Sequence, residues 1–281
     1  MTGGFCMKQR SILFVPPVSD KMIDKGLTTE ADRVIFDLED AVAVQEKKTA
    51  RDRLSRQLAS KENLHPFYIR VNDAESPFYH EDVKALQNIP DIGIVLPKTA
   101  SAEQVRQLQK KLPGRPLLPI IESAAGVWYA KEIAESCAEV ETLAFGSIDF
   151  SLDIQAAGLP DESELLYARS RIVLACRLAG KKPPVDSVFT NFQDAEGFRR
   201  QAAMVKGLGF QGKLLIHPSQ AGQANEVFSP SDEEIFKAEK IVRAFQEAEA
   251  EGLAAVQVDG EMIDYPVYYR SRNILQASEK S

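Results

Sequence analysis

Cysteine, histidine and long apolar runs are all scarce in this 281-residue sequence. The three cysteines, Cys6, Cys137 and Cys176, are odd in number and never form a C-x-x-C pair, so neither a disulfide framework nor a zinc site is predicted. No apolar stretch approaches the roughly eighteen residues of a membrane span, and Met1–Lys8 lacks the apolar core of a signal peptide. We therefore expect a cytoplasmic protein that does not enter a membrane.

Positive charge is also in deficit, because the formal net charge is −7. This balance argues against broad contact with nucleic acid or anionic lipid, although local Arg and Lys could still bind a small anion. With 44% hydrophobic and 27% charged residues, the composition is that of an ordinary globular chain. Its length allows one large core or two small ones.

Short apolar runs recur along the chain, and helix-forming segments separate them. A run of four to eight apolar residues is typical of a strand buried on both faces, and parallel strands need helical crossovers. The predicted strands are 11–15, 33–36, 67–71, 92–96, 117–121, 142–145, 185–189 and 213–216, and the clearest helices are 45–58, 101–112, 130–137, 165–178 and 195–208. Eight such units predict an α/β fold, a (β/α)8 TIM barrel over residues 1–218.

The remaining residues, 219–281, form a predicted C-terminal helical extension. Ser231-Asp-Glu-Glu234 is a capping-box pattern before a helix that would run to about Glu249. A short segment that turns at Asp259-Gly260 precedes a last helix from about Tyr265. No linker rich in Pro or Gly separates this part, so we interpret it as an appendage of the barrel.

Polar residues follow most of the predicted strands. In a barrel of this kind the site lies at the carboxyl ends of the strands, so these residues should converge. They show no Ser/His/Asp arrangement and no activated Cys, which argues against hydrolysis through a Ser or Cys nucleophile. They are Pro16, Asp37 to Asp40, Arg70, Asn72, Pro97, Lys98, Glu122, Asp149, Asn191 and His217.

Glu122 and Asp149 follow the fifth and sixth predicted strands, which places their carboxylates next to each other. Two carboxylates without a neighbouring His or Cys suit a hard divalent ion, and Mg²⁺ commonly takes one or two protein carboxylates. Mn²⁺ accepts the same oxygen ligands and stays an alternative. Another interpretation is that each is an isolated polar strand end, hydrogen-bonded to backbone.

Seven motifs follow one another along the chain, at residues 10–16, 34–42, 69–72, 96–98, 121–126, 145–149 and 216–220. In this order they resemble the motifs of the citrate lyase β-subunit-like proteins of the HpcH/HpaI aldolase superfamily, which includes malyl-CoA and citramalyl-CoA lyases. The resemblance covers nearly the whole chain, and it implies a barrel that assembles as trimers or hexamers and binds Mg²⁺ and an acyl thioester in its mouth.

The resemblance also assigns roles to individual residues. It implies that Glu122 and Asp149 bind the metal, that Glu122 thereby takes part in substrate binding, and that Arg70 contacts the substrate and stabilises negative charge on the thioester oxygen. A purely structural Arg70, paired with an acid at a strand end, is the alternative. The further implied groups are the Glu39-Asp40 pair, which would hold metal-bound water, and the backbone amides of Gly146, Ser147 and Ile148, which would receive a substrate carboxylate.

The C-terminal extension carries one more candidate. Gly260-Glu-Met-Ile-Asp264 resembles a segment of malyl-CoA and citramalyl-CoA lyases whose Asp reaches a neighbouring subunit's site as acid/base. The resemblance implies that Asp264 is catalytic and that the extension is a lid over a neighbouring subunit. Alternatively, Asp264 only caps the last helix.

These features predict a Mg²⁺-dependent carbon–carbon lyase that cleaves a short 3-hydroxyacyl-CoA. The first choice is (3S)-citramalyl-CoA, which would give acetyl-CoA and pyruvate. Malyl-CoA lyase and the citryl-carrier lyase subunit are alternatives, and a non-catalytic acyl-CoA-binding protein is an alternative of another class. Pro17 stands where many relatives have Gly in the loop that approaches CoA phosphates, so the choice between CoA and a carrier-protein thioester stays open.

Overall fold

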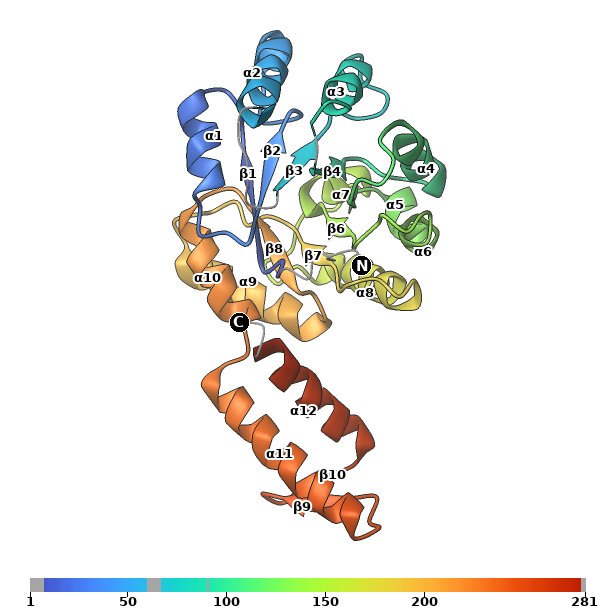
Figure 1. Cartoon of the computed structure of the whole chain (residues 1–281). Helices are drawn as coiled ribbons and strands as arrows, with labels where there is room; N and C mark the ends of the chain where they lie inside the picture. Colours follow the sequence, from blue (N-terminus) through green and yellow to red (C-terminus); the bar gives the residue numbers. More distant parts are fainter. Residues whose placement is uncertain (1–7, 60–66, 90, 279–281) are drawn as a thin grey trace. The chain divides into compact units, whose positions relative to one another are not determined.

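Eight parallel strands close into a barrel in a computed structural model that describes residues 8–59, 67–89 and 91–278 (Figure 1). Each strand pairs with the next along the chain, and β8 closes the barrel by pairing with β1, with Leu13 opposite Leu215. The strands are β1 Ser11–Val15, β2 Arg33–Asp37, β3 Phe67–Arg70, β4 Gly93–Leu96, β5 Leu117–Ile121, β6 Ala144–Phe145, β7 Val185–Asp186 and β8 Gly212–Leu215. The predicted fold class is confirmed.

Helices between the strands surround the barrel (Figure 1). They are α1 Asp20–Leu27, α2 Lys47–Ala59, α3 Tyr79–Leu86, α4 Ala102–Lys111, α5 Ala124–Trp128, α6 Ala130–Ala134, α7 Ser147–Asp153, α8 Leu166–Leu178, α9 Ala195–Leu208 and α10 Ser219–Phe228, with short 3-10 turns at Val44–Glu46 and Ser163–Leu165. Alternate residues of every strand point into the barrel and form one apolar core: Ile12, Ile35, Tyr68, Val95, Leu118, Ile120, Ala144, Val185 and Leu214.

Two strands are two or more residues shorter than their apolar pattern predicts. Strand β7 stops at Asp186, although the predicted strand runs to residue 189. Ser187 and Val188 leave the ladder and line a cavity at the mouth of the barrel. Strand β6 is likewise shorter than its run, because only Ala144 and Phe145 form ladder bonds.

The chain divides into two compact units, residues 1–225 and 226–281. The division falls within α10, whereas we expected the extension to begin at residue 219. In the second unit, α11 Asp232–Ala250 begins with the predicted capping box of Ser231 and Glu234. The hairpin of β9 Val256–Val258 and β10 Glu261–Ile263 turns at Asp259 and Gly260, whose φ angles of 49° and 84° suit a type I′ turn.

The second unit has its own small core. The last helix, α12 Tyr265–Ser278, packs with α11 and the hairpin around Ile241, Phe245, Val258, Ile263 and Tyr268. Among the described residues of either unit, none of the helices has the length and apolar character needed to cross a membrane.

Candidate functional site

A cavity of about 340 Å³ lies at the carboxyl ends of the barrel strands, where the predicted site residues were expected to converge. One part of its wall is charged and another part is apolar. The lining residues are Phe14, Asp37, Asp40, Ala41, Arg70, Ile120, Glu122, Gly146, Ile148, Asp149, Ser187, Val188, Leu214 and Ile216.

Arg70 is held in this cavity by a buried carboxylate on the neighbouring strand. Its Nε donates to Asp37 Oδ1 at 2.7 Å, and its Nη2 donates to Asp37 Oδ2 at 2.6 Å. Asp37 is 1% exposed and also accepts the backbone N–H groups of Glu39 and Ala41. Burial lowers the pKa of Arg70, but the bonds to Asp37 outweigh it and raise the pKa. The guanidinium is therefore charged and its orientation is fixed. Its Nη1 nitrogen makes no hydrogen bond to Asp37.

The Nη1 nitrogen of Arg70 faces the two acids that were expected to hold metal-bound water. It lies 3.0 Å from Glu39 Oε2 and 3.5 Å from Asp40 Oδ2. Lys98 Nζ donates to Glu39 Oε1 at 3.0 Å and forms an ion pair with it. Burial raises the pKa of Glu39 despite these two cations. Both acids thus contact cations, and their role toward metal-bound water stays a prediction.

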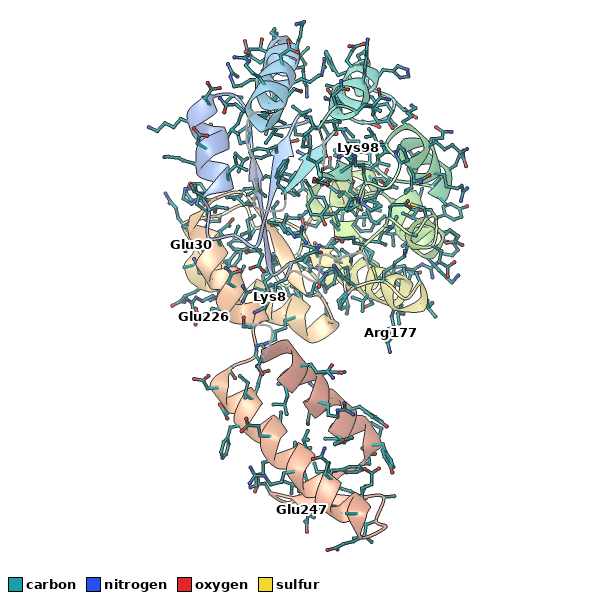
Figure 2. All side chains as sticks on the ribbon, in the orientation of Figure 1. Lys8, Glu30, Lys98, Arg177, Glu226 and Glu247 are labelled. Atoms are coloured by element: carbon teal, nitrogen blue, oxygen red, sulfur yellow. The ribbon has the colours of Figure 1, made fainter. Side chains whose placement is uncertain are left out.

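Glu122 is positioned by two unusual backbone features. Its Oε1 accepts the backbone N–H of Lys98 at 2.5 Å, and Lys98, labelled in Figure 2, has a left-handed φ of +48° that non-glycine residues seldom adopt. A Cβ on Gly146 would lie 2.5 Å from Glu122 Oε2, so only glycine leaves room for this carboxylate. Burial, together with the charge of Asp149, raises the pKa of Glu122 to about 8 against the opposing effect of the Lys98 amide.

Asp149 lies in the first turn of α7 and lines the same cavity as Glu122. The two strand ends are neighbours, since Ile121 pairs with Phe145. In the described part of the chain no hydrogen bond or ion pair engages the Asp149 carboxylate, and no group of three or more His, Cys, Asp or Glu side chains could hold a metal. Two carboxylates, one of them without a partner, fit a Mg²⁺ ion whose remaining coordination positions are filled by water and substrate oxygens.

The three backbone amides expected to receive a substrate carboxylate differ in availability. Gly146 N–H donates to Ile121 O at 2.9 Å, and Ser147 N–H donates to Ser187 Oγ at 3.0 Å. Ile148 is the second residue of α7, where the N–H has no helical acceptor, and among the described residues it has no other acceptor. Ile148 also lines the cavity. The expectation therefore narrows to the Ile148 amide.

Asp264 belongs to the second compact unit, and there it caps a helix. Its Oδ1 accepts the backbone N–H of Val267 at 3.3 Å at the start of α12. This is the structural use that an Asp before a helix commonly has. It leaves one carboxylate oxygen for other contacts, so the catalytic role stays a prediction.

Some polar residues near the mouth have structural partners. His217 stacks on Phe192 at 4.8 Å between ring centroids, and its Nδ1 lies 2.7 Å from Ser219 Oγ. Asp153 accepts the backbone N–H of Ala124 at 2.7 Å. Trp128 is 60% exposed and lies against Arg171.

Sequence reasoning did not assign a role to Asp37 or to Ser187. Asp37 is the last residue of β2. A pairing of Arg70 with an acid at a strand end was an alternative, but the sequence did not show which acid. Ser187 was assigned to the interior of a longer strand, so its approach to α7 could not be foreseen. The register of β2 against β3 sets Asp37 opposite Arg70, and knowledge of this register would have identified Asp37 as the partner of Arg70.

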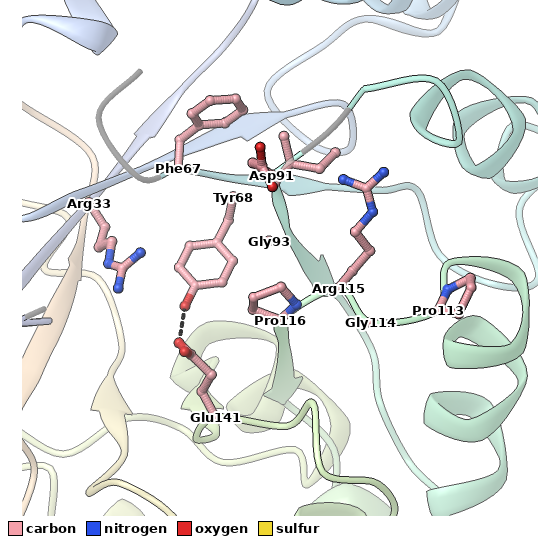
Figure 3. A pocket seen from close by; sticks show the side chains of 11 residues that line it. Arg33, Phe67, Tyr68, Asp91, Gly93, Pro113, Gly114, Arg115, Pro116 and Glu141 are labelled. Atoms are coloured by element: carbon pink, nitrogen blue, oxygen red, sulfur yellow. Dashed lines mark hydrogen bonds between the residues drawn. The ribbon is translucent and has the colours of Figure 1, made fainter. Parts of the chain in front are cut away.

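A second cavity, of about 390 Å³, lies at the amino ends of the strands (Figure 3). Tyr68 Oη donates to Glu141 Oε2 at 2.7 Å there, and a Cβ on Gly93 would overlap the Tyr68 ring. Burial, followed by the charge of Glu141, raises the pKa of Tyr68. None of the predicted site residues lines this cavity, and polar contacts at this end of a barrel generally serve stability.

Comparison with known proteins assigns the chain to a family. Residues 10–218 match the model of the HpcH/HpaI aldolase/citrate lyase family. Citrate lyase subunit beta of Leuconostoc mesenteroides subsp. cremoris is 35% identical over 280 residues, which cover 95% of this chain and 92% of that protein. A (3S)-malyl-CoA thioesterase of Cereibacter sphaeroides is also 35% identical, over 96% of this chain and 94% of the relative.

A solved structure is similar over nearly the full length. It is the crystal structure of protein CitE from Mycobacterium tuberculosis in complex with magnesium, acetoacetate and coenzyme A. Its TM-score is 0.83 at 26% identity, and the match covers 98% of this chain and 99% of that chain. Fold, strand-end site and sequence agree: the chain belongs to the HpcH/HpaI aldolase/citrate lyase family and is a carbon–carbon lyase.

Proposed function

We propose that this protein is a Mg²⁺-dependent lyase that cleaves (3S)-citramalyl-CoA to acetyl-CoA and pyruvate. The observation that carries the proposal is that Glu122, Asp149 and Arg70 line one cavity at the barrel mouth. The similarity to a protein solved with magnesium, acetoacetate and coenzyme A supports both the metal and the thioester.

We assign each group a role in this reaction. Mg²⁺ held by Glu122 and Asp149 would supply a Lewis acid that favours loss of the substrate's hydroxyl proton. Arg70, aimed by Asp37, stabilises the negative charge that develops on the thioester oxygen when the carbon–carbon bond breaks. The Ile148 amide binds the carboxylate of the departing oxo acid. Asp264 of a neighbouring subunit acts as acid/base: it accepts the substrate's hydroxyl proton and returns a proton to the α-carbon of the enolate.

The cavity favours pyruvate over the other oxo acids. Seven of its lining residues are apolar and suit a methyl group: Phe14, Ala41, Ile120, Ile148, Val188, Leu214 and Ile216. Arg70 is its one cationic residue among those described, and it already faces three carboxylates. The second carboxylate of oxaloacetate would therefore lack an uncommitted cation, and glyoxylate would leave the apolar surface uncovered.

Two relatives keep alternatives in view. The similarity to citrate lyase subunit beta supports a citryl thioester on a carrier protein, and the similarity to a malyl-CoA thioesterase supports hydrolysis of the thioester. A non-catalytic acyl-CoA-binding protein would not need two carboxylates and a fixed arginine in one cavity.

The test is a condensation and cleavage assay with purified protein. Acetyl-CoA is supplied with pyruvate, glyoxylate or oxaloacetate, with Mg²⁺, Mn²⁺ or EDTA, and thioester products and free CoA are separated by chromatography. We expect citramalyl-CoA from pyruvate, a kcat/KM at least about 10-fold above that for glyoxylate, and no turnover in EDTA. A preference for oxaloacetate would mean that the substrate is a citryl thioester and not citramalyl-CoA. Release of free CoA alone would favour the thioesterase, and no reaction at all would favour the binding protein.

A further inference from the structure

Ser187 stands at the point where β7 leaves the barrel ladder and enters the cavity wall. It is 2% exposed and lines the same cavity as Asp149 and Ile148. Ser147 makes both of its polar contacts: Ser147 N–H donates to Ser187 Oγ at 3.0 Å, and Ser147 Oγ donates to it at 2.7 Å.

These two bonds occupy the acceptor capacity of the Ser187 hydroxyl. A serine hydroxyl has two lone pairs and one proton to donate. Both lone pairs of Ser187 Oγ accept from Ser147, so its own O–H has to point elsewhere. The part of the chain that the structure describes offers this proton no acceptor, and a buried donor without a partner is costly.

We propose that Ser187 is a substrate-binding residue whose O–H donates a hydrogen bond to the carboxylate of the oxo-acid part of the substrate. This inference rests on the proposed lyase function. Ile148, in the first turn of α7, lines the same cavity and its amide has no helical acceptor, so the two donors would come from the ends of β7 and β6 and contact one carboxylate from two elements. The bonds from Ser147 fix the direction of the Ser187 proton before substrate arrives.

Binding of pyruvate, measured by calorimetry in saturating Mg²⁺, tests the proposal. A hydrogen bond to a carboxylate contributes more than one between neutral groups, so Ser187→Ala should raise the Kd for pyruvate by about 10-fold or more. Ser187→Thr keeps the hydroxyl and should stay within about threefold of the wild type, whereas Ser187→Cys, a weak donor of similar size, should follow Ser187→Ala.

A matched control separates this role from loss of a buried hydroxyl in general. Ser11 is also buried, and its Oγ donates to Asn225 and accepts from Asp32 N–H at the other end of the barrel. Ser11→Ala should lower the thermal stability while the Kd for pyruvate is unchanged. The Kd for Mg²⁺ alone should be unchanged in every Ser187 variant.

Three results would overturn the donor role. They are unchanged pyruvate binding in Ser187→Ala and Ser187→Cys, equal loss in Ser187→Thr, or a parallel loss of Mg²⁺ affinity that shows Ser187 acting only through α7. Failure of the proposed function is distinguishable, because it would appear as no pyruvate binding by the wild-type protein.

Discussion

At the scale of single residues, the position of Glu122 depends on backbone geometry more than on side-chain partners. The amide of Lys98, in a left-handed conformation, donates to one carboxylate oxygen, and the missing side chain of Gly146 leaves space for the other. A left-handed non-glycine residue costs about 1–3 kcal/mol, which the surrounding structure has to offset. Such strain commonly accompanies functional sites.

Gly146→Ala should therefore reduce turnover sharply. The added methyl group would lie 2.5 Å from Glu122 Oε2 and would displace that carboxylate, with an overpacking cost of about 1–3 kcal/mol. Gly222→Ala is the matched control, because its Cβ would meet no atom within 4 Å inside α10, where alanine stabilises a helix by about 1 kcal/mol. Kinetics and thermal unfolding of both variants check this, and an active Gly146→Ala enzyme would contradict the position assigned to Glu122.

Removal of either proposed metal carboxylate should abolish Mg²⁺ binding. Glu122→Gln and Asp149→Asn keep the size of the side chain but remove one of only two anionic ligands. Asp153→Asn, four residues beyond Asp149, should bind Mg²⁺ as the wild type does, because Asp153 contacts the Ala124 backbone instead. Calorimetric titration of Mg²⁺ into each variant is the measurement. Retained affinity in Asp149→Asn would place the ion elsewhere.

At the scale of elements, the apolar runs predicted all eight barrel strands, since burial on both faces leaves a plain signal. The prediction was wrong at the end of β7, where Ser187 and Val188 were assigned to the strand. These two residues line the cavity and do not belong to the strand ladder. An apolar run does not show at which residue the hydrogen bonds to the neighbouring strand stop. The cap of α11 at Ser231, in contrast, depends on local sequence and was predicted correctly.

The ion pair between Asp37 on β2 and Arg70 on β3 should contribute strongly to the stability of the fold. Asp37→Asn leaves the buried Arg70 without its bidentate partner, and loss of one member of a buried pair costs about 3–5 kcal/mol. Asp52→Asn removes an exposed pair with Lys48 on α2 and should cost less than about 1 kcal/mol. Urea unfolding of both variants compares the two. Similar small losses would mean that Arg70 finds another carboxylate, such as Glu39.

At the scale of the whole molecule, Asp264 and the barrel mouth belong to different compact units. The resemblance predicts that it does so in a neighbouring subunit of a trimer or hexamer. Asn caps helices as well as Asp does, so Asp264→Asn should keep the α12 cap and the thermal stability while turnover falls. Full turnover would leave capping as its role.

Subunit complementation extends this test. If Asp264 acts across subunits, mixing Asp264→Asn and Asp149→Ala chains should restore part of the activity that each lacks, because some mixed sites contain both intact residues. Sedimentation analysis should show an oligomer before and after mixing. If each variant is inactive and a verified mixed oligomer is inactive too, Asp264 does not act in the site of a neighbouring subunit.

The sequence by itself determined the barrel, the capped helix of the extension and the set of polar residues at the strand ends, because periodicity and capping are local signals. Tertiary structure decided which of these residues touch. Asp37 meets Arg70 through the register of β2 and β3, Lys98 meets Glu122 through a left-handed backbone, and Ser187 meets Ser147 where β7 ends. Each contact joins residues far apart along the chain, and the pairing of neighbouring strands brings them within hydrogen-bond distance.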